Sequence, residues 1–187
     1  MDVPQLYRRA SNTFGAHVRA VGADQWQAPT PCADWDVRTL VNHIVNEELW
    51  VPELLGGKTV DEVGDRFDGD LLGNDPVAAW ESAAARALQE VEADGAMERT
   101  THLSFGDFPG SEYTLQIFAD HLVHGWDLAV GIGADTKLDP ELVQAATAWF
   151  EPVEPAYREM GAIGERPPIP ADADPQTKLL AMFGRRQ

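Results

Sequence analysis

The chain has 187 residues and a formal net charge of −17, because 31 Asp and Glu outnumber 14 Lys and Arg. This length predicts one domain over residues 1–187, and the 44% share of hydrophobic residues is enough for a core. The acidity excludes nucleic acid and anionic membrane surfaces as partners, since both reward clustered Lys and Arg. Without a run of about 18 apolar residues or a secretory leader pattern, we expect a soluble cytoplasmic protein.

Hydrophobic residues recur at helical spacing along most of the chain. We expect helices over residues 4–23, 36–55, 75–93, 112–132 and 139–150, and a short last helix over 175–183. Asp36 and Ser111 are the expected N-caps of the second and fourth helices. Pro52 is expected to kink or shorten the last turn of the second.

The connections between these helices are long and rich in Gly, Pro and Asp. Residues 28–35 form a proline-rich break, and residues 58–74 form a loop with room for one helical turn. Residues 98–112 fit either a short hairpin or a long loop. Strand signals are otherwise nearly absent, so the pattern predicts an all-α bundle, with a proline-punctuated C-terminal tail over about 152–187 packed on it.

The predicted fourth helix carries a narrow polar stripe on an otherwise apolar surface. Gln116, Asp120, His124 and Asp127 follow the spacing i, i+4, i+8 and i+11. Asp120 and His124, one turn apart, can place two ligand atoms on one metal ion, whereas His121 lies at the edge of the stripe. The alternative is an ordinary solvent-facing stripe, although this one lacks Lys, Arg and Glu.

The predicted second helix supplies the other half of a metal site. His43 lies on its apolar side, with Glu47 one turn later. Such a histidine is either a hydrogen-bonded core residue or a ligand that faces another helix. With Asp120 and His124 it makes a set of two histidines and one carboxylate, which leaves a coordination position open for water or substrate. This set suits zinc, with nickel or iron as alternatives.

Two stretches together resemble a known family. Residues 30–43 (TPCADWDVRTLVNH) and 120–129 (DHLVHGWDLA) are similar to stand-alone actinobacterial relatives of the metal-binding N-terminal domain of mycothiol-dependent maleylpyruvate isomerase. Residues 169–180 (IPADADPQTKLL) resemble the closing segment of those relatives. The resemblance implies a DinB/YfiT-like four-helix bundle with extra short helices and a divalent metal, zinc first, held by His43, Asp120 and His124. Asp120 stands where the isomerase has Glu.

The same resemblance implies a function class. The isomerase has a second domain where this chain has the short tail, so maleylpyruvate isomerisation itself is not carried over. We expect a divalent-metal-binding protein, a transferase or isomerase that uses mycothiol or another low-molecular-weight thiol against an electrophilic substrate. Glu47 and Asp127 are candidates for orienting ligands or moving protons. The alternatives are a non-catalytic metal- or ligand-binding bundle, a metal-dependent hydrolase, or a structural bundle without metal. Relatives in this superfamily often pair, which implies a homodimer.

Two further residues have open roles. Cys32 is read first as a small buried hydrophobe and second as a nucleophile whose pKa would need lowering. Trp126, which follows the predicted ligands, is expected to lie in the core or to line a groove, with the wall of a substrate pocket as a further option.

Overall fold

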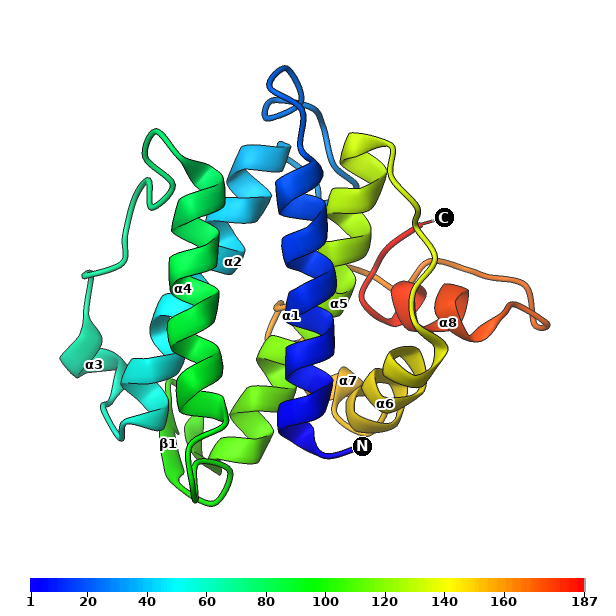
Figure 1. The fold of residues 1–187 in the computed structure, drawn as a ribbon. Helices are drawn as coiled ribbons and strands as arrows, with labels where there is room; N and C mark the ends of the chain where they lie inside the picture. The colour runs from blue at the N-terminus through cyan, green and yellow to red at the C-terminus, as the bar shows by residue number, and fades with distance from the viewer. Residues whose placement is uncertain (187) are drawn as a thin grey trace.

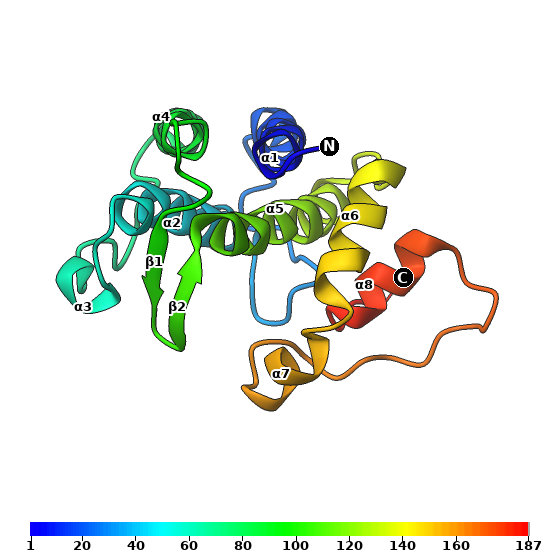
Figure 2. The same ribbon diagram turned by 90° about the horizontal axis from the view of Figure 1, so that it is seen from below.

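The computed structural model describes residues 1–186. The longest helices in this part of the chain are α1 (Val3–Ala20), α2 (Val37–Leu55), α4 (Pro76–Val91) and α5 (Gly110–Ile132). They form two layers, with α1 and α4 in one and α2 and α5 in the other (Figures 1 and 2). Helix α5 packs against α1 and α2, and α2 also packs against α4, so α2 and α5 lie side by side.

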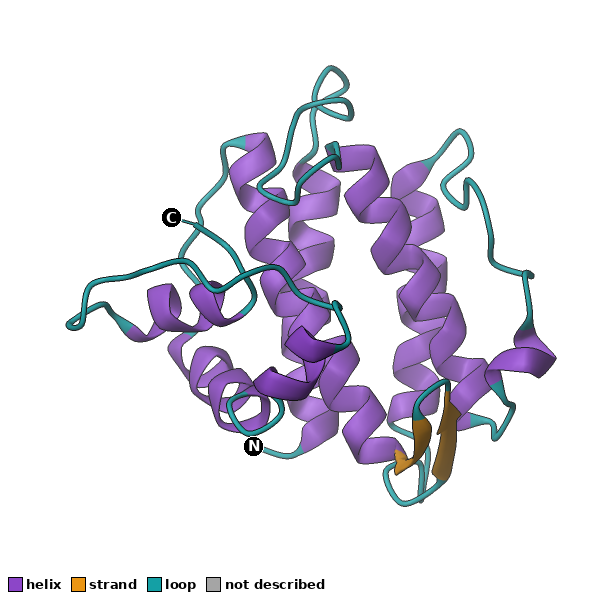
Figure 3. Ribbon diagram, turned by 180° about the vertical axis from the view of Figure 1, so that it is seen from behind, coloured by secondary structure: helices purple, strands orange, loops and turns teal. Residues whose placement is uncertain are grey.

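The shorter elements extend this bundle at its ends and on one side. They are α3 (Val60–Val63), β1 (Thr100–Leu103), β2 (Gly106–Pro109), α6 (Pro140–Phe150), α7 (Glu154–Glu159) and α8 (Pro175–Met182). Strands β1 and β2 pair as an antiparallel hairpin, with Thr101 opposite Phe108. Helices α6, α7 and α8 lie beyond α5, on the side away from α4 (Figure 2), and a long loop joins α7 to α8 (Figure 3). The predicted all-α class is confirmed, with the hairpin as the only sheet in the described residues.

Local sequence explains where most helices begin. An aspartate precedes each of α1, α2, α4, α6 and α8, and its side chain accepts a backbone N–H from the first turn. A proline stands in the first turn of all of these except α2. Proline is favoured there, because its fixed φ is helical and its missing N–H would have had no partner.

The structure adjusts several predicted boundaries. Helix α1 ends at Ala20 because Val21 has extended backbone, and the predicted turn within 58–74 is α3. The segment 98–112 contains the hairpin rather than only a loop. Pro52 lies inside α2, which nevertheless continues to Leu55. Helix α7 lies in the part of the tail before residue 175, where no helix was expected.

The prediction that Ser111 caps the fourth helix is wrong. Helix α5 begins at Gly110, and Pro109 before it offers no side-chain cap. The first N–H groups are satisfied differently: Gly110 donates to the carbonyl of Arg99 and Ser111 to that of Met97. The chain leading into the hairpin therefore caps α5, which a local sequence pattern does not reveal.

Two buried apolar clusters hold the helices together. One lies between α2 and α4 and contains Phe14, Leu40 and Trp80. The larger one runs from α1 through α5 to α6 and α8, where the rings of Phe150 and Phe183 stack 4.0 Å apart. The end of the tail is therefore part of the core. Burial of each such side chain stabilises the fold by about 1.5–3 kcal/mol. No helix of the described residues has the length and apolar character needed to cross a membrane.

Candidate metal centre

Helices α2 and α5 bring the three predicted ligands together. One ligand atom from each of His43, Asp120 and His124 lies within 4.8 Å of the other two. His43 Nε2 is 3.7 Å from Asp120 Oδ2, which is too long for a hydrogen bond. Two tetrahedral ligands about 2.1 Å from one zinc ion stand about 3.4 Å apart, so this spacing fits an ion between them.

The polar stripe of α5 does not face solvent. His124 and Asp127 are buried, and Gln116 and Asp120 are half-buried on the wall of a cavity. The solvent-facing alternative is therefore wrong. Burial by itself lowers the pKa of His43. The neighbouring Asp120 carboxylate outweighs this effect, so the pKa of His43 lies above its ordinary value. The two side chains thus interact electrostatically across the gap between them.

Behind His124 lies a buried charged pair. His124 Nδ1 is 3.0 Å from Asp127 Oδ2, close enough for an electrostatic contact although the two atoms are not aligned for a hydrogen bond, and Nε2 of the same ring stays available to a metal. Arg185, which follows α8, donates to Asp127 Oδ2 over 2.8 Å through Nη2. Burial favours the neutral form of Asp127, but the contacts with His124 and Arg185 outweigh it and hold the pKa of this carboxyl below its ordinary value.

A second buried polar group lies beside the ligands, inside the core. Tyr7 of α1 donates a hydrogen bond to Glu48 of α2, and Glu48 Oε1 lies 2.6 Å from His121 Nε2 of α5. This last contact brings the two groups together without hydrogen-bond alignment. His121 is fully buried and packs against Phe14 and Trp80, so it points away from the three ligands. The group joins three helices next to Asp120.

The ligands face a cavity of about 620 Å³. Its walls come from the 31–35 loop, from α2 and α5, and from α6 and the tail after it. Its aromatic side chains are Trp35, Tyr113, Trp149, Tyr157 and Phe183. The Trp35 ring lies 4.9 Å from that of His43 and 5.7 Å from that of His124. Trp126 is buried in the larger core cluster, as first expected, and does not line this cavity, so its optional role as a pocket wall is wrong.

Three titratable side chains of the cavity have shifted pKa values. Burial, together with the Asp120 carboxylate, raises the pKa of Glu47 from 4.5 to about 7. Burial raises the pKa of Tyr113 well above its ordinary value, and its hydroxyl is buried without a hydrogen-bond partner. Burial also raises the pKa of the Cys32 thiol, although Arg185 opposes this. Cys32 therefore stays a neutral thiol near pH 7, which argues against its role as a nucleophile.

Comparison with known proteins places this chain in a family. Residues 7–129 match the model of the mycothiol maleylpyruvate isomerase N-terminal domain. The chain belongs to this family. Uncharacterised proteins from two strains of Mycobacterium tuberculosis are 35% identical to it, over 99% of this chain and 98% of theirs, in agreement with the predicted actinobacterial relation.

A solved structure shares the fold of this chain. The crystal structure of a mutant of the mycothiol-dependent maleylpyruvate isomerase matches with a TM-score of 0.64 at 16% identity. The match covers 88% of this chain and 72% of that one. It supports the predicted DinB-like helical fold. The three candidate ligands lie inside the family-matched residues, whereas Trp149, Phe183 and Arg185 lie outside them.

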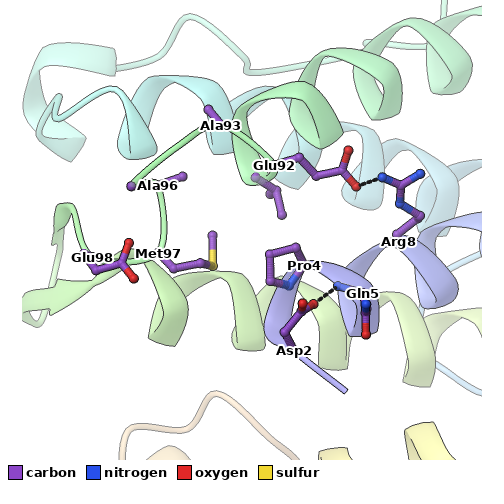
Figure 4. A pocket seen from close by; sticks show the side chains of 11 residues that line it. Asp2, Pro4, Gln5, Arg8, Glu92, Ala93, Ala96, Met97 and Glu98 are labelled. Carbon is purple, nitrogen blue, oxygen red and sulfur yellow. Dashed lines mark hydrogen bonds and ion pairs between the residues drawn. The ribbon is translucent and has the colours of Figure 1, made fainter.

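Another hollow lies far from the ligands. It is lined by the start of α1 and by residues 91–98, and has a volume of about 510 Å³ (Figure 4). Arg8 pairs there with Glu92, and Asp2 accepts the N–H of Gln5. The groups of metal-ligating side chains found among the described residues all lie elsewhere, so this hollow is not the candidate site.

Proposed function

We propose that this chain binds a divalent metal, zinc first, through His43, Asp120 and His124, and uses a low-molecular-weight thiol such as mycothiol to transfer or isomerise an electrophilic substrate. The observation that carries the proposal is the convergence of the three ligand atoms within 4.8 Å at the wall of a cavity. Two imidazole nitrogens and one carboxylate are a catalytic zinc donor set, although nickel or iron also accept it. Family membership supports the thiol.

The residues around the ligands fit this chemistry. A bound divalent ion would lower the pKa of a thiol at its open position, so that thiolate is available near neutral pH. Asp127 lies 3.0 Å from Nδ1 of His124, where its carboxylate would favour Nε2 as the donor atom. Arg185 in turn holds Asp127. The aromatic walls restrict water around the reacting groups.

Glu47 is our candidate for the group that holds or moves a proton. Its carboxyl lines the same cavity as the ligands, and its pKa of about 7 populates both protonation states near neutral pH. A general acid or base works best under that condition. Glu47 can therefore accept a proton from a thiol that enters the cavity and return it to a product.

Cobalt substitution tests the proposal directly. Protein loaded with Co²⁺ and titrated with mycothiol or 2-mercaptoethanol should gain a cobalt–thiolate absorption band in the near ultraviolet. The band should be lost in His124→Ala and kept in His102→Ala, because His102 lies in the hairpin, paired with Asp107. A cobalt spectrum that does not respond to either thiol would refute the thiol chemistry and favour a non-catalytic metal-binding bundle or a metal-dependent hydrolase.

A further inference from the structure

We propose that the electrophile taken by this cavity is an uncharged compound with a flat apolar body, and that the cavity rejects carboxylates. The inference rests on the proposed function in one respect, that the cavity beside His43, Asp120 and His124 is the substrate site. It goes further, because it names the class of substrate from the charges and surfaces of the walls.

The cavity has no free cation to receive a carboxylate. Arg185 is the one Lys or Arg among the described residues that line it. Its Nε and Nη2 both bind Asp127, and its Nη1 donates to the carbonyl of Phe183 over 2.8 Å. Because Asp127 is fully buried, it neutralises this guanidinium without help from a ligand. A carboxylate therefore finds no cation here that lacks an anionic partner.

The remaining charges of the cavity are negative. Glu47 and Asp120 both present carboxylates to it. In the proposed function a divalent ion would be neutralised by the Asp120 carboxylate and by a thiolate at its open position, so the ion would not supply the missing cation. A second anion would meet like charge in a partly desolvated space, where the repulsion is strong.

The other walls suit a flat, uncharged molecule. Trp149 of α6, Tyr157 of α7 and Phe183 after α8 bring aromatic rings from three segments. Trp149 donates its Nε1 proton to Glu112 over 2.9 Å, which fixes the orientation of its ring. Such surfaces stack on aromatic or conjugated groups and gain from the burial of apolar area.

One neutral polar group of the cavity lacks a hydrogen-bond partner. The Tyr113 side chain is 4% exposed and lines the cavity, and its hydroxyl has no hydrogen bond. A buried hydroxyl without a partner is destabilising, and a hydroxyl both donates and accepts. A carbonyl, amide or hydroxyl group of the ligand satisfies it without bringing a charge into the cavity.

Two compounds of the same shape and different charge test this inference. Benzamide and benzoate are titrated into the full-length, metal-free protein at pH 8.5, well above the ordinary pKa of histidine. Binding is followed by tryptophan fluorescence, since Trp35 and Trp149 line the cavity, and by NMR chemical shifts. Benzamide should bind at least about tenfold more tightly than benzoate. Tyr113→Phe should weaken benzamide severalfold, and Glu47→Gln should narrow the difference between the two compounds.

The opposite result overturns the inference. Equal or tighter binding of benzoate would show that a cation is available, and no response to either compound would show that the walls do not accept a flat ligand. Either outcome is separate from the proposed function, because no metal is present. Selective benzamide binding by a protein that fails the cobalt test would leave the neutral-ligand cavity standing and remove the thiol chemistry.

Discussion

Replacement of Glu47 by glutamine keeps the size of the side chain but removes its titration. The pKa of Glu47 is about 7 in the folded protein against 4.5 for the free side chain. The folded state therefore keeps the proton to a higher pH than the unfolded state does, and stability falls as pH rises from about 4.5 to about 7. One pKa unit corresponds to about 1.4 kcal/mol, so ionised Glu47 costs up to about 3 kcal/mol at pH 8 and about 1.4 kcal/mol at pH 5.5.

Urea unfolding of the metal-free protein, followed by circular dichroism, measures this cost. We expect Glu47→Gln to be more stable than the wild type, and the gain to be about twice as large at pH 8 as at pH 5.5. The lower pH stays above the sequence pI of about 4.4, which favours solubility. Glu165→Gln, at an exposed position, serves as the control and should change little at either pH. A gain that is equal at the two pH values, or a loss at pH 8, would refute the assigned environment of Glu47.

Four other substitutions test the surroundings of the site and the packing of α5. Asp127→Asn should weaken zinc binding by about 10–100-fold, because it removes the carboxylate that orients His124 and pairs with Arg185. Competition with a chromophoric chelator measures the zinc affinity, and an unchanged affinity would contradict the assigned role of Asp127. Glu48→Gln should destabilise the protein by roughly 1–3 kcal/mol in urea unfolding, because it disturbs the buried contacts with Tyr7 and His121; an unchanged midpoint would argue against them. Gly110→Ala should lower Tm strongly, because its Cβ would collide with the carbonyl oxygen of Ala96. Gly125→Ala should be neutral or stabilising, because the nearest neighbour of its Cβ is Phe14 at 3.9 Å. A similar Tm for Gly110→Ala and Gly125→Ala would contradict the packing at the start of α5.

The starts of the helices were predictable because they depend on neighbouring residues. Aspartate caps and first-turn prolines are read within four residues, and they mark α1, α4 and α6 correctly. The start of α5 was not predictable in this way. Its cap consists of two carbonyl groups supplied by chain that precedes the hairpin, and only tertiary structure brings them there.

The site follows the same division. Helical spacing and family resemblance were enough to propose His43, Asp120 and His124, because Asp120 and His124 share one helix and His43 lies in a recognisable motif. Arg185 could not, because it reaches Asp127 from 58 residues away and has no periodicity to mark it. The tail aromatics and the unpartnered hydroxyl of Tyr113 likewise became visible only when the cavity was formed.

The central claim is that His43, Asp120 and His124 hold one divalent ion, and elemental analysis of the purified, tag-free protein tests it most directly. The wild type and His102→Ala should carry about one equivalent of a divalent metal per chain, while His43→Ala and His124→Ala should carry almost none and remain folded. A wild type that stays without metal after reconstitution with zinc, or a His124→Ala variant that keeps its full metal content, would contradict the claim.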